Sequence, residues 1–286
     1  MRILLTGSGG FIGKNLKSYL KDKYELLTPR SFELDLVDSV AVQKYFATND
    51  IDFVIHCGSI GGTRGTQDKD TTVEDNLAMV DNILSGKGKD VRVILFGSGA
   101  MYDKSRNLHK VKESEIGEVV PNDLYGKSKL LIAEKIKNRQ DVLMFNIFAC
   151  YGYGEKDSRF PSDAINKVIN GEDIEINQNV IFDYLFVEDM QKIIEYFIEN
   201  KPTENIINIT PTESISLLEI AKIVNQFADK PVGIKIKNEK MNNEYTGSNL
   251  MLLKNFPNFT FTPIEVGLKK LFEYKNNLIK ELKWIN

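Results

Sequence analysis

The chain has 286 residues, of which 42% are hydrophobic, and its formal net charge is −3. This length and apolar content suffice for one large domain or two smaller ones with a buried core. So small a net charge creates no long-range field for nucleic acid or a membrane surface, and no apolar run reaches the length of a membrane span. Met1 leads directly into a strand-like run without a cleavable signal, so we expect a cytoplasmic protein that binds neither nucleic acid nor membranes.

Short apolar runs alternate with helical periods along the first half of the chain. The runs are Arg2–Thr6, Tyr24–Thr28, Ile51–His56, Val91–Gly97 and Asp141–Phe148. Buried strands separated by helices predict a parallel sheet with right-handed crossovers. The expected fold is therefore α/β, with a Rossmann-type doubly wound parallel sheet. After residue 151 the strands become shorter, and helices are predicted over Leu217–Ala228 and from Pro263 onward.

The sharpest local signal is TGSGGFIG, which runs from Thr6 to Gly13. Gly7, Gly10 and Gly13 follow the first predicted strand and open the first predicted helix. Small residues at these positions let backbone amides approach a pyrophosphate held at the positive end of the helix. The motif, with Phe11 and Ile12 inside it, therefore predicts dinucleotide binding.

The end of the second predicted strand indicates which dinucleotide is bound. An acidic residue there would accept hydrogen bonds from the adenosine ribose of NAD. The sequence instead reads LLTPRSFELDL, with Arg30 and Ser31 and no carboxylate at the strand end. A guanidinium and a hydroxyl suit a 2′-phosphate, so NADP(H) is preferred and NAD(H) remains possible. Asp35 and Leu36, slightly further on, are expected to flank the adenine.

The stretch LYGKSKLLIAEKI, which begins at Leu124, predicts an amphipathic helix. Tyr125 and Lys129 are four residues apart, so both side chains can lie on one face of this helix. An ordinary helix with surface lysines would show the same pattern. The meaning of the pair therefore depends on the other motifs of the chain.

Those motifs resemble the extended short-chain dehydrogenase/reductases. Besides TGSGGFIG and LYGKSK, the chain carries LFGSGAMY at Leu95–Tyr102, ACYGYGE at Ala149–Glu155 and DYLFVEDM at Asp183–Met190, in the order found in that family. The resemblance covers nearly the whole chain, and within the family it is greatest to the nucleotide-sugar enzymes, especially GDP-fucose synthase.

The resemblance implies three catalytic residues, which are Ser98, Tyr125 and Lys129. Ser98 would hydrogen-bond the substrate oxygen, Tyr125 would exchange the proton, and Lys129 would also hold the nicotinamide ribose. A cation about 4 Å from a phenol, at an effective dielectric of about 20, favours the phenolate by about 4 kcal/mol. We therefore expect Lys129 to lower the pKa of Tyr125. Further contacts are expected from Cys57 and Gly58 to the cofactor, and from Gly99, Ala100, Ala149, Cys150 and Arg159, with Ser98, to the substrate.

Departures from the family pattern reduce the number of reactions that the protein could catalyse. Ala100 stands where GDP-fucose synthase has a cysteine for epimerisation, and where dehydratases and decarboxylases have a carboxylate. Alanine cannot carry a proton, which leaves carbonyl reduction or 4-epimerisation. Ala149 stands where the family usually has asparagine. Phe182 stands where an arginine usually holds the diphosphate, and Arg159, Lys156 or Lys237 could replace it.

These inferences together predict NADPH-dependent reduction of a nucleotide-linked 4-keto-deoxysugar, with hydride added to C4 and the proton from Tyr125. Two alternatives remain open, a nucleotide-sugar 4-epimerase that retains NAD(P) and a non-catalytic NADP-binding regulator. We expect residues 1–150 to form the NADP-binding Rossmann domain, with a returning segment near 180–210. Residues 151–286 should form mainly a smaller, mixed α/β substrate-binding region.

The remaining expectations concern assembly, thiols and metals. In the family, helices corresponding to Thr71–Leu84 and to the one beginning at Leu124 pair into a four-helix bundle, so a homodimer is expected. Cys57 and Cys150 lie in apolar runs, which favours reduced thiols over a disulfide. His56 and His109 do not form a metal pair, and no metal site is expected.

Overall fold

The centre of the fold is a parallel sheet of six strands. The computed structural model describes residues 1–63 and 65–285. The strand order is β11-β6-β4-β3-β1-β2, and every neighbouring pair is parallel. The strands are β1 (Arg2–Thr6), β2 (Glu25–Leu27), β3 (Phe53–His56), β4 (Arg92–Ser98), β6 (Val142–Ile147) and β11 (Ile206–Asn208). This topology confirms the predicted doubly wound α/β fold.

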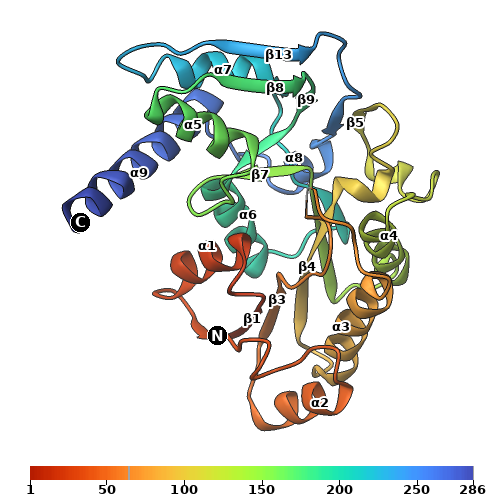
Figure 1. Ribbon diagram of the computed structural model, residues 1–286. Helices are drawn as coiled ribbons and strands as arrows, with labels where there is room; N and C mark the ends of the chain where they lie inside the picture. Colours follow the sequence, from red (N-terminus) through yellow and green to blue (C-terminus); the bar gives the residue numbers. More distant parts are fainter. Residues whose placement is uncertain (64, 286) are drawn as a thin grey trace.

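Helices cover both faces of this sheet (Figure 1). Helices α1 (Phe11–Leu20) and α6 (Val187–Glu199) pack on each other on one face, and α2 (Ser39–Thr48), α3 (Thr72–Gly86) and α4 (Leu124–Ile136) form a row on the other. Because side chains alternate along a strand, Ile3 and Leu5 belong to the first core and Leu4 to the second. Burial on both faces explains why the strands read as continuous apolar runs.

A smaller mixed region lies at the top of Figure 1. It contains a four-stranded sheet in the order β12-β9-β14-β5 and the strand pairs β10-β7 and β13-β8. Its strands are β5 (Leu108–Val111), β7 (Ala149–Tyr151), β8 (Ile174–Gln178), β9 (Ile181–Phe182), β10 (Tyr184–Phe186), β12 (Ile215–Ser216), β13 (Ile234–Asn238) and β14 (Tyr245–Gly247). The helices α5 (Phe160–Asn170), α7 (Leu217–Asn225), α8 (Leu250–Asn255) and α9 (Ile264–Ile285) complete the fold, with the short 3₁₀ helices η1 (Gly99–Tyr102) and η2 (Glu113–Glu115).

The two regions exchange segments. Strand β11 follows α6 and pairs with β6, so the chain returns to the central sheet after residue 180. In the other direction, β5 leaves the first half of the chain and pairs with β14. His109 therefore lies on a strand, with its Nδ1 2.9 Å from Oε1 of Glu244.

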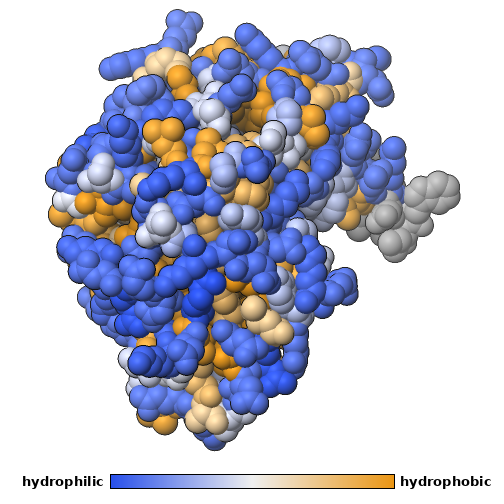
Figure 2. Space-filling view, turned by 180° about the vertical axis from the view of Figure 1, so that it is seen from behind, coloured by the Kyte–Doolittle hydropathy of each residue, from blue (hydrophilic) through white to orange (hydrophobic). Residues whose placement is uncertain are grey.

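The predicted element ends differ from the observed ones by a few residues, as is usual where strands and helices fray. Helix α7 ends at Asn225, short of the predicted Ala228, because the amides of Gln226 and Phe227 turn to the carbonyls of Ile223 and Val224 three residues back. Figure 2 shows the opposite side of the molecule, where hydrophobic side chains are interspersed among hydrophilic ones. Across residues 1–63 and 65–285, the helices are too short or too polar to traverse a lipid bilayer.

Candidate active site

The turn between β1 and α1 brings three segments of backbone into contact. Gly7 has a φ of 68°, which favours glycine, and a Cβ on it would lie 2.5 Å from the amide nitrogen of Gly58. The amide of Gly10 donates to the carbonyl oxygen of Gly7 at 3.0 Å, and a Cβ on Gly13 would strike the same oxygen. Gly10 is the N-cap of α1, so the positive end of this helix opens at the turn.

A cavity of about 330 Å³ lies directly above this turn, at the carboxyl ends of β1 and β3. Such a position is where parallel α/β sheets hold ligands. Seven of the predicted cofactor residues line it, namely Gly7, Gly10, Arg30, Ser31, Asp35, Leu36 and Gly58. The other lining residues are Thr6, Ser8, Gly9, Pro29, Leu34, Val37, Ser59, Ile60 and Met79. Ser8 and Gly9 belong to the glycine-rich motif, whereas Met79 comes from α3, and no local pattern marks it.

The remaining predicted cofactor residues do not line the cavity. Phe11 and Ile12 begin α1 and pack against the hydrophobic core of that face. Gly13 is buried beneath the turn, and Cys57 directly follows β3. Both cysteines are free, and burial raises the pKa of each thiol, so they remain protonated packing groups.

Arg30 holds its charged end against the glycine-rich turn. Its Cζ, Nη1 and Nη2 are each 3.1 Å from the position that a Cβ of Gly9 would occupy, so the guanidinium lies flat on that backbone. The acidic side chains nearby accept hydrogen bonds from backbone amides. Glu33 accepts from the Arg30 amide, and Asp35 accepts from the Val37 amide. The lining of the cavity therefore carries one cation, Arg30, and one carboxylate, Asp35.

The sheet and helix α4 bring Ser98, Tyr125 and Lys129 together. Ser98 ends β4, and Tyr125 is the second residue of α4, which Asp123 caps through a 2.9 Å bond from the Gly126 amide. The helix start packs closely on η1, since a Cβ on Gly126 would lie 2.6 Å from the carbonyl oxygen of Ala100. Ser98 is close enough to Tyr125 to lower the pKa of the phenol, and Lys129 Nζ lies 5.5 Å from the centre of the tyrosine ring.

The expected effect of Lys129 on Tyr125 was wrong. Burial raises the pKa of Tyr125, and the opposing contributions come from Ser98 and Arg159. The Lys129 ammonium donates to the Phe96 carbonyl oxygen at 2.9 Å, and its Nζ lies 5.5 Å from the centre of the Tyr125 ring. Burial also lowers the pKa of Lys129 from 10.5 to about 8, which weakens it as a permanent cation.

A loop that carries no recognised motif covers Tyr125. Gly62, with a φ of 69°, lies so close that a Cβ there would be 2.9 Å from the tyrosine ring. Asp68 ties this loop to the helix, because its carboxylate accepts from the amides of both Gly62 and Tyr125 at 2.9 Å. Sequence inspection missed Gly62 and Asp68, since nothing within residues 57–71 marks them locally.

The residues predicted to contact the substrate differ in how deeply they are buried. Gly99 and Ala100 are buried in η1, Ala149 and Cys150 are half-buried on β7, and Arg159 is exposed. Arg159 precedes α5, and its charge lowers the pKa of both Tyr125 and Tyr245, so it faces the same site.

The other residues considered for the diphosphate differ in their surroundings. Phe182 packs edge-on against Tyr184 and Tyr245, with ring centres 5.5 and 5.7 Å apart. Lys156 is exposed, whereas Lys237 lies on β13 in a 2.8 Å ion pair with Glu175. Of these cations, Arg159 is the one whose charge acts on the phenol of Tyr125.

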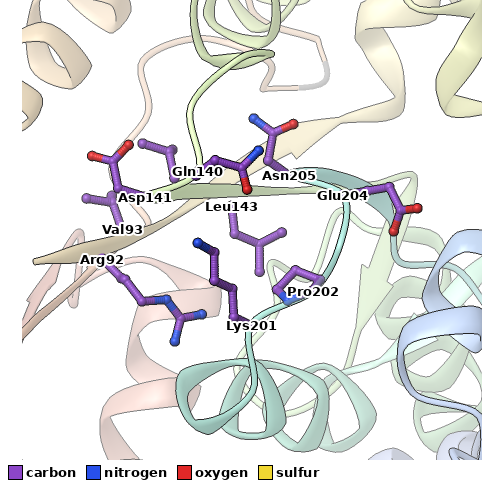
Figure 3. Close-up of a pocket in the computed structure, with 10 residues that line it drawn as sticks. Arg92, Val93, Gln140, Asp141, Leu143, Lys201, Pro202, Glu204 and Asn205 are labelled. Atoms are coloured by element: carbon purple, nitrogen blue, oxygen red, sulfur yellow. The ribbon is translucent and has the colours of Figure 1, made fainter. Parts of the chain in front are cut away.

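A second hollow lies at the opposite end of the sheet (Figure 3), where β4 and β6 begin. Its lining includes Arg92, Asp141, Lys201 and Glu204. Its volume is about 10 Å³, which is about the space needed for one water molecule. The hollow is therefore too small to compete with the cavity at the carboxyl ends as a ligand site.

Comparisons with known proteins agree with this architecture. The chain is 27% identical over 273 residues to GDP-L-colitose synthase of Yersinia pseudotuberculosis, which covers 83% of this chain and 88% of that protein. It is 30% identical over 171 residues to GDP-L-fucose synthase of Azorhizobium caulinodans, and this match covers 56% of this chain and 54% of that protein. Among solved structures, GDP-mannoheptose C4 reductase from Campylobacter jejuni with NADP bound superposes with a TM-score of 0.82 at 18% identity, covering 96% of this chain and 98% of that one.

A sequence profile of the NAD dependent epimerase/dehydratase family matches residues 3–210, which is well over half of the chain. The match spans the glycine-rich turn, Ser98, Tyr125, Lys129 and the returning strand β11. The chain therefore belongs to the NAD dependent epimerase/dehydratase family, the extended short-chain dehydrogenase/reductases that its motifs predicted.

Proposed function

We propose that the protein reduces the 4-keto group of a nucleotide-linked deoxysugar and uses NADPH as the reductant. The observation that carries this proposal is the meeting of Ser98 and Tyr125 at the carboxyl end of the sheet that also holds the 330 Å³ cavity. Several relatives bear the names of nucleotide-sugar synthases and reductases, which supports the same substrate class.

The cavity residues fit NADP(H). The open backbone at Gly7 and Gly10, with the positive end of α1, suits a pyrophosphate. Arg30 and Ser31 would hold the 2′-phosphate, because a guanidinium forms forked, charge-assisted bonds to phosphate oxygens. Lys129 donates one N–H to the Phe96 carbonyl oxygen, and its remaining N–H groups would donate to the nicotinamide ribose.

The side chains have separate tasks in the reduction. NADPH, when bound, supplies the hydride that adds to C4 of the sugar. As the C–H bond forms, the π electrons of the carbonyl move onto O4, and Tyr125 transfers its phenolic proton to that oxygen. Ser98 donates a hydrogen bond to the same oxygen and stabilises the charge that develops there.

The protonation state of Tyr125 favours reduction over the alternatives. Because burial raises its pKa, the phenol is protonated at neutral pH and is ready to act as an acid. A 4-epimerase would begin by oxidising the sugar, for which Tyr125 must first act as a base. A non-catalytic regulator would not need Ser98, Tyr125 and Lys129 to meet at one point.

The test is single-turnover oxidation of NADPH with GDP-linked and dTDP-linked 4-keto-6-deoxyhexoses. We expect reduction of one of these substrates by the wild-type protein. Tyr125→Phe should lower the rate constant by about 10²–10⁴-fold, the usual effect of removing a positioned acid, while NADPH affinity stays unchanged. A near-normal rate in Tyr125→Phe would reject Tyr125 as the proton donor. Tightly retained cofactor and interconversion of 4-hydroxy sugars would identify an epimerase instead.

A further inference from the structure

The loop that covers Tyr125 places its backbone against the tyrosine ring. This loop, residues 57–63 and 65–71, joins β3 to α3. Three atoms of the Tyr125 ring, Cγ, Cδ1 and Cε1, each lie 2.9 Å from the position that a Cβ on Gly62 would occupy. The φ of Gly62 is 69°, a conformation that residues with a side chain rarely adopt. Glycine at position 62 therefore lets bare backbone lie directly beside the ring of the proposed acid.

One carboxylate joins this loop to the tyrosine. Asp68 Oδ1 accepts a hydrogen bond from the Gly62 amide, and Asp68 Oδ2 accepts one from the Tyr125 amide, both at 2.9 Å. Tyr125 is the second residue of α4, where a backbone amide has no partner inside the helix. The N-cap Asp123 bonds the Gly126 amide, so Asp68 supplies the acceptor for the Tyr125 amide.

A second set of hydrogen bonds holds the same segments from α3, which lies beside α4 (Figure 1). Asn76 Oδ1 accepts from the Ile60 amide, and Asn76 Nδ2 donates to the Ile60 carbonyl oxygen, both at 2.9 Å. Asn76 Nδ2 also donates to Ser128 Oγ at 3.1 Å, and Ser128 Oγ donates to the Tyr125 carbonyl oxygen at 2.8 Å. Asn76 and Ser128 are both buried, so water does not compete for these bonds. The Tyr125 backbone is thus held at its amide and at its carbonyl.

We propose that Asp68 is a positioning residue that clamps the Gly62 backbone against the ring of Tyr125 and so holds the phenol where it meets the reacting oxygen of the substrate. With the Tyr125 backbone held on both sides, the remaining freedom is rotation of the side chain about its own bonds. The Gly62 backbone limits that rotation, because it fills the space beside Cδ1 and Cε1 of the ring. This inference rests on the proposed reductase function.

The charge of Asp68 also acts on the phenol. Burial is the largest cause of the raised pKa of Tyr125, the Asp123 and Asp68 carboxylates raise it further, and Ser98 and Arg159 oppose the rise. The other titratable side chains that face this phenol are Lys129 and Tyr245. The proposed acid works only while it is protonated, so activity should fall as the pH rises through this pKa. Loss of the Asp68 charge should lower the pKa and move this basic limb to lower pH.

The first experiment compares two glycines of the loop by single-turnover NADPH oxidation with the 4-keto sugar nucleotide that the wild type reduces. In Gly62→Ala, the methyl group must displace the Tyr125 ring by roughly 0.6–1.1 Å to reach an ordinary carbon–carbon contact. The rate constant should fall about 10²-fold, the effect of a misplacement of about 1 Å. Gly65→Ala is the matched control, because Gly65 has a similar φ of 77° and nothing lies within 4 Å of a Cβ there. It adds the same backbone strain without touching the tyrosine and should keep the wild-type rate.

The second experiment removes one of the two bonds of the clamp. Asp68→Asn keeps the shape of the side chain but replaces one carboxylate oxygen with an NH₂ group, which cannot accept from an amide. The rate constant should fall about 10- to 100-fold, the scale of one hydrogen bond to a charged group. NADPH affinity should stay near the wild-type value, because Asp68 is not among the residues that line the cofactor cavity. The basic limb of the pH profile should move to lower pH, which a purely structural role of Asp68 would not cause.

The Tyr125→Phe background separates positioning of the acid from general damage. Without the phenolic proton, Gly62→Ala and Asp68→Asn should cost little further rate, because the group that they misplace is already absent. The inference alone is overturned by equal fractional losses in both backgrounds, by equal losses in Gly62→Ala and Gly65→Ala, or by wild-type rates in Gly62→Ala and Asp68→Asn. If Gly62→Ala does not fold, Asp68→Asn decides, and a wild-type rate with an unmoved basic limb overturns the inference. If Tyr125→Phe itself keeps full activity, the proposed function fails.

Discussion

Replacing Lys129 with methionine should stabilise the fold while it damages the site. Lys129 is 5% exposed, and burial lowers its pKa from 10.5 to about 8. A shift of one pKa unit corresponds to about 1.4 kcal/mol, so the buried ammonium opposes folding by about 3 kcal/mol when it is charged. Methionine has a similar length and no charge, but it loses the hydrogen bond to Phe96, which contributes about 1 kcal/mol. The net gain in unfolding free energy should be about 2 kcal/mol at pH 7.

The pH dependence distinguishes this cause from improved packing. The folded-state pKa of Lys129 lies below the unfolded value, so the unfolded chain binds more protons between about pH 8 and 10.5. The contribution of Lys129 to wild-type stability therefore becomes less unfavourable as the pH rises through this window. The advantage of Lys129→Met should be greatest below pH 8 and should disappear near pH 10.5.

Urea unfolding of the wild type and the variant at pH 7 and pH 10 measures both effects. Lys127→Met is the matched control, because Lys127 is exposed on the same helix and its removal should leave the unfolding free energy nearly unchanged. The more stable Lys129→Met variant should nevertheless bind NADPH more weakly and react more slowly. A variant less stable than the wild type at pH 7, or a stability gain that does not change with pH, would refute this reasoning.

Two further predictions concern the cofactor and the assembly. Arg30→Ala should weaken NADPH binding by about 1.5–3 kcal/mol and leave NADH binding nearly unchanged, because only NADPH carries the 2′-phosphate. Fluorescence titration with both cofactors checks this, and equal losses would assign Arg30 a structural role. Pairing of α3 and α4 across a two-fold axis should give a homodimer, whose mass by light scattering at micromolar concentration is twice that of one chain. A monomeric mass would show that the apolar faces of α3 and α4 pack only against the sheet of their own chain.

Five strands of the central sheet could be predicted because each lies in a local apolar run, whereas β11 has three residues and was covered only by the expected returning segment near 180–210. A strand covered by helices on both faces is apolar at most positions, and β3, β4 and β6 are almost completely buried. The short strands of the smaller region give a weaker signal. Strand β9 has two residues and β14 has three, and their places depend on pairing with the distant strand β5.

The site could be predicted only where its residues belong to motifs. The glycine-rich turn, Ser98, Tyr125 and Lys129 each lie in a recognisable stretch, and the structure brings Ser98, Tyr125 and Lys129 together. Gly62, Asp68 and Tyr245 approach Ser98 and Tyr125 through the fold, so no local pattern could identify them. The pKa of Tyr125 was also beyond sequence reasoning, because it depends on burial, which opposes and exceeds the influence of nearby charge.

Arg159 links substrate recognition to the protonation of the site. Its positive charge lowers the pKa of both Tyr125 and Tyr245, against the effect of burial. If Arg159 replaces the missing arginine at Phe182 and holds a substrate diphosphate, that dianion would cancel most of its influence on the two phenols. Substrate binding would then raise both pKa values further and keep both protons in place. Tyr125 needs its proton for O4 in the proposed reduction, so one cation at residue 159 would serve reduction better than a cation beside the phenol itself.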